Sequence, residues 1–180
     1  MNYSKITPYD VANGIGVRTS IFVSGCSFHC KGCFNTEAQD FFYGTPVTDE
    51  TISFLNECVQ DPRSAGLSIL GGDPLWQNEY GISQLIELCG IAHRYNKNVW
   101  LWSGFKFEDI IQFEVQSLIG QEPIPIKYFR KELIKNVDVL VDGQFIEAQK
   151  DPSLPYRGSS NQRVIDVKKS LQKGQVVLWC

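Results

Sequence analysis

The sequence predicts an α/β fold in which a mostly parallel sheet is connected by helical crossovers. Short runs rich in apolar and β-branched residues alternate with segments whose apolar residues recur at helical spacing. Successive predicted strands begin about 30 to 50 residues apart, which leaves room for a helix between neighbours and favours parallel pairing. The chain is also shorter than the roughly 250 residues of a complete eight-stranded TIM barrel, so we expect fewer strands than such a barrel contains.

The predicted strands are short and end in glycine or polar residues. In chain order they cover residues 19–24, 66–70, 99–102, 137–141 and 176–179. The first of them, Thr-Ser-Ile-Phe-Val-Ser, leads directly into a cluster of cysteines. The sequence therefore predicts a strand that delivers reactive side chains to one edge of the sheet.

Three helices are predicted between these strands. The first follows Thr48, whose hydroxyl suits an N-cap position, and its apolar residues recur at helical spacing. The second has an apolar stripe over residues 82–92. The third is predicted from Glu108 to Ile119, where Gly120 and two following prolines end it.

Composition and charge exclude several classes of protein. The formal net charge is −3, and no segment is basic enough to suggest a nucleic-acid partner. No stretch approaches the roughly 20 apolar residues of a membrane span, and the first residues lack the apolar core of a secretory signal. We therefore expect one cytoplasmic domain over residues 1–180 that binds neither nucleic acid nor membrane.

Cys26, Cys30 and Cys33 form the pattern C-x3-C-x2-C immediately after the first predicted strand. Three thiolates from one short loop can bind three irons of a [4Fe–4S] cluster and leave the fourth iron open. A closed zinc site would need a fourth ligand, which His29 or Cys180 would have to supply, and zinc remains the alternative at this point. Cys58, Cys89 and Cys180 are expected to be ordinary thiols.

Each of the four main strands ends in glycine beside a polar or reactive side chain. These ends are Gly25 with Cys26, Gly71 and Gly72 with Asp73, Ser103 with Gly104, and Asp142 with Gly143. Ligands of parallel α/β folds bind at the carboxyl ends of strands, so the four ends predict one site. At that site, glycine carbonyls and a carboxylate are suited to accept hydrogen bonds from an ammonium group.

The cysteine spacing, with the aromatic Phe34 after the third cysteine, resembles the radical S-adenosylmethionine enzymes. Further segments resemble the activating enzymes of anaerobic ribonucleoside-triphosphate reductases. They are Asn-Gly-Ile-Gly-Val-Arg at 13–18, Gly-Gly-Asp-Pro-Leu at 71–75, Trp-Leu-Trp-Ser-Gly-Phe at 100–105, Asp-Val-Leu-Val-Asp-Gly at 138–143 and Arg-Gly-Ser-Ser-Asn-Gln-Arg at 157–163. The resemblance covers most of residues 1–163, and we expect this core to be followed by an extension over 164–180.

The resemblance implies a partial barrel of the radical S-adenosylmethionine type and a role for each site residue. Cys26, Cys30 and Cys33 would ligate the [4Fe–4S] cluster, whose open iron would bind S-adenosylmethionine. Gly72, with Gly71 and Asp73, would hold the amino group of that cofactor. The backbone of Gly32, Cys33 and Phe34 would lie against it, and Ser103 and Asp142 would contact its ribose or methionyl part.

The resemblance also implies a reaction and its partners. A low-potential donor such as a flavodoxin would reduce the cluster, and reductive cleavage of S-adenosylmethionine would give methionine and a 5′-deoxyadenosyl radical. That radical would remove a hydrogen atom from a glycine of the large reductase subunit and leave a glycyl radical there. No side chain of this chain would act as a catalytic acid or base, because the cofactor performs the chemistry.

Two alternatives remain open on the sequence. In the first, the chain activates another glycyl radical enzyme, such as pyruvate formate-lyase. In the second, it is a non-catalytic iron–sulfur or zinc module that transfers electrons or stabilises a complex.

Overall fold

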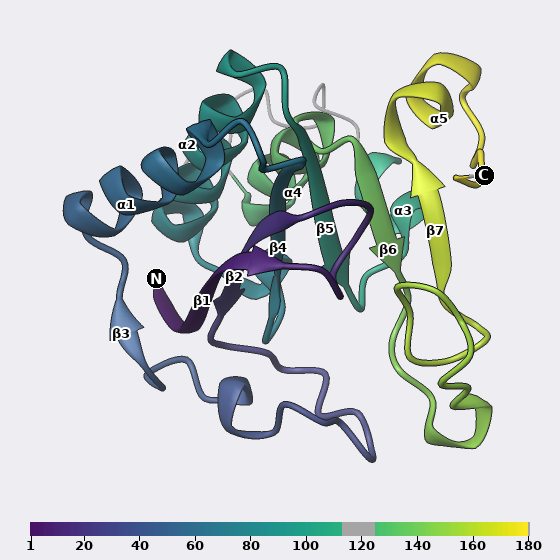
Figure 1. The fold of residues 1–180 in the computed structure, drawn as a ribbon. Coiled ribbons are helices and arrows are strands. Elements are labelled where there is room, and N and C mark those ends of the chain that lie inside the picture. Colours follow the sequence, from purple (N-terminus) through teal and green to yellow (C-terminus); the bar gives the residue numbers. More distant parts are fainter. Residues whose placement is uncertain (113–124, 180) are drawn as a thin grey trace.

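A computed structural model of the protein describes residues 1–112 and 125–179, and within them seven strands form a single sheet (Figure 1). The strand order is β3-β1-β2-β4-β5-β6-β7. The strands are β1 (Asn2–Asp10), β2 (Arg18–Val23), β3 (Thr45–Pro46), β4 (Gly66–Gly71), β5 (Asn98–Ser103), β6 (Val139–Asp142) and β7 (Arg163–Asp166). The mixed α/β class is confirmed.

The four central strands, β2, β4, β5 and β6, pair in parallel, whereas β1, β3 and β7 add antiparallel edges. Each of the four main predicted strands is confirmed to within two residues at both ends. The prediction of a strand over residues 176–179 is wrong, because this segment makes a single bridge between Leu178 and Ile165. The segment lies beyond the edge strand β7, where no second strand extends the pairing in the described residues.

The helices are α1 (Asp49–Gln60), α2 (Glu79–Arg94), α3 (Phe107–Ile111), α4 (Ile126–Lys135) and α5 (Val167–Lys173). Thr48 caps α1 as predicted, with its hydroxyl accepting a hydrogen bond from the Thr51 amide. The predicted third helix begins at α3, which ends at Ile111. Its expected continuation over residues 113–119, with Gly120, lies outside the described residues.

The main core lies between the sheet and helices α1, α2 and α4, which lie together at one face of the sheet (Figure 1). Ile69 of β4, Leu101 of β5 and Leu140 of β6 are fully buried in it beside Leu85 of α2. Each buried side chain of this size stabilises the fold by about 1.5 to 3 kcal/mol. Trp100 points to the opposite face, where a smaller cluster forms. The central strands are thus buried on both faces, as parallel strands usually are.

The segment after residue 163 also belongs to this architecture. Strand β7 pairs with β6, and Ile165 and Val167 are fully buried in the main core. The division into a core over 1–163 and an extension over 164–180 stays a prediction. Within the described part of the chain, no helix combines the length and apolarity that crossing a bilayer requires.

Two long connections leave the same edge of the sheet. The first follows β2 and contains the three cysteines, and the second joins β6 to β7 over residues 143–162. In Figure 1 both hang below the sheet, at the end to which β6 points. The parallel strands therefore deliver their carboxyl ends, and the predicted site residues, to one edge.

Candidate functional site

The cysteine loop is anchored to the short helix η1 (Glu37–Gln39) that follows it. The amide of Gly25 donates to the Ala38 carbonyl at 2.8 Å, and the amide of Cys26 donates to the Gln39 carbonyl at 3.0 Å. Gly25 has a φ of 105°, and a Cβ there would lie 2.3 Å from the Phe41 ring. Glycine is thus required for the chain to turn from β2 into the loop.

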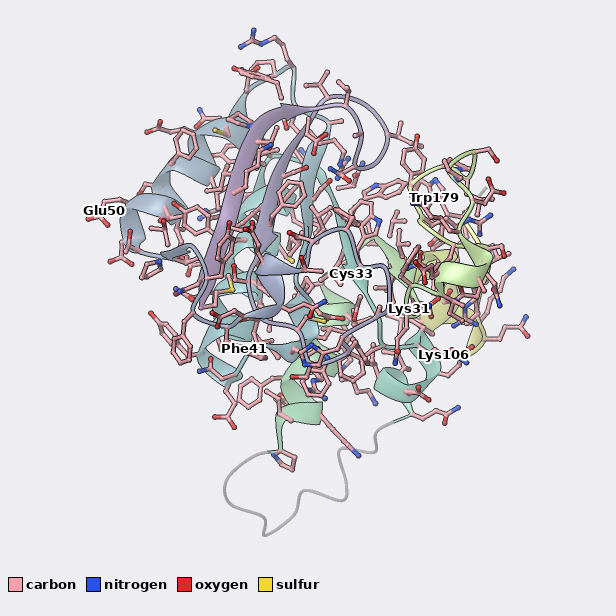
Figure 2. All side chains as sticks on the ribbon, turned by 90° about the horizontal axis from the view of Figure 1, so that it is seen from below. Lys31, Cys33, Phe41, Glu50, Lys106 and Trp179 are labelled. Atoms are coloured by element: carbon pink, nitrogen blue, oxygen red, sulfur yellow. The ribbon has the colours of Figure 1, made fainter. Side chains whose placement is uncertain are left out.

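All three cysteines of the loop are partly buried and carry free thiols. Burial above all, with smaller contributions from the neighbouring Asp73, Cys30 and Cys33, raises the pKa of Cys26 to about 11, against a hydrogen bond from the Phe28 amide. The thiols therefore lie close enough to one another to interact. Figure 2, which looks onto this edge of the sheet from below, places Cys33 near the centre of the face.

The donor set fits an iron–sulfur cluster better than a single ion. Among residues 1–112 and 125–179, no three His, Cys, Asp or Glu side chains are grouped so as to hold one metal ion. Cluster ligands need no such convergence, because each thiolate binds its own iron. His29, the ligand considered for zinc, is exposed and has its Nδ1 2.9 Å from the Gln39 side-chain oxygen.

Backbone hydrogen bonds at Gly72 and the residue after it hold the end of β4 against the base of the cysteine loop. Its amide donates to the Val23 carbonyl at 2.7 Å, and the next amide, of Asp73, donates to the Gly25 carbonyl at 2.9 Å. A Cβ on Gly72 would lie 2.5 Å from the Ala38 carbonyl oxygen, and one on Gly71 would lie 2.4 Å from that of Val23. Both glycines are therefore needed for the close approach of three backbone segments.

The Asp73 side chain is buried, and its carboxylate accepts hydrogen bonds within the protein. The Ser103 hydroxyl lies 3.0 Å from each carboxylate oxygen, the Gly104 amide donates at 2.7 Å and the Leu75 amide at 2.8 Å. Burial raises the pKa of Asp73 to about 6 despite these donors. The structure thus brings two predicted cofactor contacts, Asp73 and Ser103, into contact with each other.

Asp142, at the end of β6, also has partners within the chain. It accepts a hydrogen bond from the Phe107 amide at 2.9 Å and contacts the Arg163 guanidinium through both oxygens. Arg163 makes a second bidentate pair with Glu108, at 2.9 and 2.7 Å, which lowers the pKa of Glu108 to about 2. The cofactor contact expected of Asp142 stays a prediction, and its observed contacts join α3 to β6 and β7.

An aromatic cluster that the sequence did not predict packs beside the cysteine loop. Phe28, Trp76 and Phe105 contact one another with ring centroids 4.9 to 5.5 Å apart, and the Arg130 guanidinium lies over Trp76 and Phe105. A Cβ on Gly104 would lie 2.6 Å from the Phe28 ring. The only sequence signal was an aromatic residue soon after each of three strand ends, too common a feature to identify a site.

The residues at the end of the cysteine loop face outward. Phe34 is 90% exposed, so its side chain packs little against the chain itself. Lys31 forms an ion pair with Glu147 at 3.3 Å, and a Cβ on Gly32 would lie 2.8 Å from a Glu147 carboxylate oxygen. The second long connection is thus in contact with the cysteine loop, and Figure 2 shows Lys31 beside Cys33 on this face.

Comparison with known proteins finds relatives over nearly the whole chain. Residues 12–165 match the family described as "4Fe-4S single cluster domain". The chain is 36% identical over 169 residues to the anaerobic ribonucleoside-triphosphate reductase-activating protein of Escherichia coli strain K12, covering 91% of this chain and 97% of that protein. It is 36% identical over 165 residues to the protein of the same name from Enterobacteria phage T4, covering 91% and 93%. A Haemophilus influenzae relative of that name is 34% identical over 166 residues, covering 90% and 96%.

Proposed function

Because the chain belongs to the family of anaerobic ribonucleoside-triphosphate reductase-activating proteins and contains its 4Fe-4S single cluster domain, we propose that it activates such a reductase by producing a glycyl radical in it. The observation that carries the proposal is the group of three half-buried thiols at the edge where four parallel strands end. A set of three thiols without a fourth protein ligand suits a cluster with one open iron.

Cys26, Cys30 and Cys33 would hold the cluster, and S-adenosylmethionine would bind at the open iron. When bound, the cluster would pass one electron from an external donor to S-adenosylmethionine, which would break a carbon–sulfur bond to give methionine and a radical able to take a hydrogen atom from a reductase glycine. The residues of the chain itself would bind and orient the cluster and S-adenosylmethionine and keep water away from them. The aromatic cluster of Phe28, Trp76 and Phe105 supports this role, because apolar rings beside the loop limit the access of solvent.

Gly71 and Gly72 are proposed to bring backbone close to the amino group of S-adenosylmethionine, with Gly32, Cys33 and Phe34 against the rest of the cofactor. Asp73 and Ser103 are proposed to act on the cofactor indirectly, through the backbone that they hold in place. Since they hold each other and the Gly104 amide, they fix the shapes of the two strand ends between which the cofactor would lie. Asp142 is proposed to orient the next strand end in the same way, through Arg163.

A macromolecular partner is supported by the apolar surface beside the cysteine loop. Phe34 and Phe42 are 90% and 88% exposed, and a cavity of about 720 Å³ is lined in part by Phe41, Phe42 and Trp76. Large exposed aromatic side chains mark surfaces that bind other proteins. The proposed partner is the large reductase subunit, and a second, low-potential protein such as a flavodoxin would donate the electron.

The finer features of the fold belong to the same proposal. We propose that the parallel centre of the sheet is the incomplete barrel of the radical S-adenosylmethionine type and that residues 1–180 form one domain. The cytoplasm is the proposed location, because its reducing conditions keep thiols free to bind iron.

The test is electron paramagnetic resonance of the anaerobic reductase mixed with the reconstituted protein, S-adenosylmethionine and dithionite. A glycyl doublet that depends on all components supports the proposal, with Cys30→Ala as the negative control and Cys58→Ala as the matched positive control. A doublet with pyruvate formate-lyase in place of the reductase would assign another client. A loaded cluster that yields no 5′-deoxyadenosine would favour a non-catalytic module and overturn the proposal.

A further inference from the structure

A groove lies beside the cysteine loop, between the segment after η1, the short helix η2 (Pro74–Trp76) and helix α4. It encloses about 720 Å³, and Phe41, Phe42, Trp76, Ile126 and Arg130 are among the residues that line it. In Figure 2 Phe41 lies on the same face as Cys33, with Lys31 on the other side of that cysteine. Two partner proteins are proposed for this edge of the molecule, so the question is which of them the groove fits.

The Phe42 ring is 88% exposed although its backbone is held on both sides. Its amide donates a hydrogen bond to an Asp40 carboxylate oxygen at 2.9 Å, and its carbonyl accepts one from the Asn2 side-chain amide at 3.0 Å. A ring presented to solvent on an ordered backbone loses little conformational entropy when a partner covers it, and aromatic anchors supply much of the affinity of protein interfaces. The ring therefore marks the groove as a surface that binds another protein.

Two of the aromatic side chains that line the groove also pack against the cysteine loop. The Trp76 ring contacts the ring of Phe28, which lies in the loop two residues after Cys26, with centroids 5.5 Å apart. The Phe41 ring lies so close to Gly25 that a Cβ on this glycine would come within 2.3 Å of it. Packed aromatic side chains thus connect the groove to the loop and also separate the two.

This separation distinguishes the two proposed partners. Removal of a hydrogen atom from a reductase glycine needs the reacting atoms within about 3 to 3.5 Å of each other, so the glycine must reach the cofactor itself. An electron, in contrast, can cross packed side chains without direct contact between donor and cluster. Among the described residues that line the groove there is no cysteine. A protein in the groove can therefore supply an electron, but it cannot present the glycine from there.

The groove is bordered by cations, which favour an acidic partner. Helix α4 carries four Lys and Arg residues and one Glu, in a chain whose formal net charge is −3. Arg130 lines the groove with its guanidinium over the Trp76 ring, and the exposed Lys127 is its neighbour on the helix surface. Glu79 is the one carboxylate among the described lining residues. Complementary charge at such a border steers association and selects the partner.

We propose that the groove is the docking site of the electron donor, an acidic, low-potential flavoprotein that binds with its flavin towards the Trp76 and Phe41 rings. The inference rests on the proposed function, since it requires a cluster on the three cysteines. In each transfer the reduced flavin loses one electron and the cluster gains it, and no covalent bond forms or breaks. The outer part of the cysteine loop, where Phe34 is exposed, is left to the large reductase subunit.

The test uses four variants of the full chain and a flavodoxin of net negative charge as the probe. Lys127→Glu reverses a charge beside the groove, and Phe42→Ala removes the exposed ring while both backbone hydrogen bonds of that residue remain possible. Lys173→Glu in α5 and Phe54→Ala in α1 are the matched controls, because they make the same kind of change at exposed positions that do not line the groove. Calorimetric titration of iron-free protein with oxidised flavodoxin gives each affinity.

We expect each groove variant to bind flavodoxin about three- to tenfold more weakly than the wild type, and the controls to bind as the wild type does. The deficit of Lys127→Glu should shrink as the salt concentration rises. A second measurement follows reduction of the reconstituted cluster by reduced flavodoxin in a stopped-flow instrument. At low flavodoxin concentration this reduction should slow by the same factor as the binding, whereas dithionite should reduce the cluster of every variant to the same extent.

Wild-type affinity and wild-type reduction rates in both groove variants would overturn the proposal, as would a wild-type protein that flavodoxin neither binds nor reduces. Weaker binding of the large reductase subunit, with unchanged binding of flavodoxin, would assign the groove to the reductase. A wild-type dimer that Phe42→Ala converts to a monomer would assign it to a second copy of the chain.

Failure of the proposed function has a different result. The cluster would still take electrons from flavodoxin docked in the groove, but the protein would produce no glycyl radical in the reductase. If no cluster assembled at all, calorimetry of the iron-free protein would still report whether flavodoxin binds through Phe42 and Lys127.

Discussion

The Ser103 hydroxyl donates to the buried carboxylate of Asp73, with its oxygen 3.0 Å from both carboxylate oxygens. The pair joins the carboxyl end of β5 to the turn after β4, beside the cysteine loop. Because the Gly104 and Leu75 amides also donate to this carboxylate, Asp73 orders two of the strand ends at the proposed site. Its effect on a bound cofactor would then be exerted through the backbone that it holds.

Ser103→Ala should lower the free energy of unfolding by about 1 to 2 kcal/mol, since it removes one donor from a buried carboxylate. The fold should persist, because the two amide donors remain. Urea unfolding at pH 7 measures the change. Ser83→Ala, which removes an exposed hydroxyl that bonds within α2, should stay within about 0.5 kcal/mol of wild type. Equal effects of the two substitutions would show that the Asp73 contact is energetically unimportant.

Gly72→Ala should destabilise the protein and disturb the cysteine loop. Its Cβ would meet the backbone of Ala38 and Gly25 at 2.5 to 2.9 Å, so one of these segments must move. Overpacking of this kind costs about 1 to 3 kcal/mol. Thermal unfolding measures the cost, and iron content after reconstitution reports whether the loop still binds a cluster.

Gly90→Ala is the matched control for that substitution. Gly90 lies inside α2, and a Cβ there meets no atom within 4 Å. Alanine should therefore stabilise the protein by about 0.5 to 1 kcal/mol through helix propensity alone. A Gly72→Ala protein as stable as Gly90→Ala would refute the close approach of the three backbone segments.

The central strands could be predicted because they are buried on both faces and read as continuous apolar runs, such as Leu67 to Leu70 in β4. Strand β1 was missed because its residues are mostly half-buried and polar, as at Ser4 and Thr7. Its pairing with β2 depends on contacts that are distant in the sequence. Strand β7 was missed because it has only four residues and pairs with β6 across the long connection over residues 143–162.

The cysteines and the strand ends of the site could be predicted from local sequence, but the partners of the strand-end residues could not. Ser103 lies beside Asp142 in the β5–β6 register, yet it bonds to Asp73 on the other side. The partner of Ser103 is decided by how the turns after the strands fold. The conformations of these turns also determine the aromatic cluster, since Phe28, Trp76 and Phe105 come from three separate connections.

The pair between Glu108 and Arg163 should make stability depend on pH in the acid range. The pKa of Glu108 in the folded protein is about 2, below its ordinary value of 4.5. A lowered pKa means that the stabilisation is complete above pH 4.5 and is lost as the pH falls towards 2. Because the pair is partly exposed, solvent screening limits it to about 1 kcal/mol at most.

Glu108→Gln should therefore be less stable than wild type at pH 7, and the difference should shrink as the pH falls from 4.5. Urea unfolding of both proteins at pH 7, 4 and 3 measures it. Glu87→Gln, an exposed position of α2, should give no such trend. A Glu108→Gln deficit that stays constant down to pH 3 would assign its cause to packing instead of charge.

Cys30→Ala should abolish assembly of the cluster, whereas Cys58→Ala should retain it. Cys30 lies in the loop with two other thiols, while Cys58 lies half-buried in α1, in a separate element. Removing one of three ligands leaves two irons without protein thiolates, because one iron of the cluster is already open. Iron and acid-labile sulfide per chain, with the absorbance of the reconstituted protein, measure the outcome.

Cys89→Ala should also retain the cluster, at a packing cost of about 1 kcal/mol for its fully buried site in α2. If a folded Cys58→Ala or Cys89→Ala protein bound no iron, the ligand set would have to include that thiol and the three-cysteine assignment would be wrong.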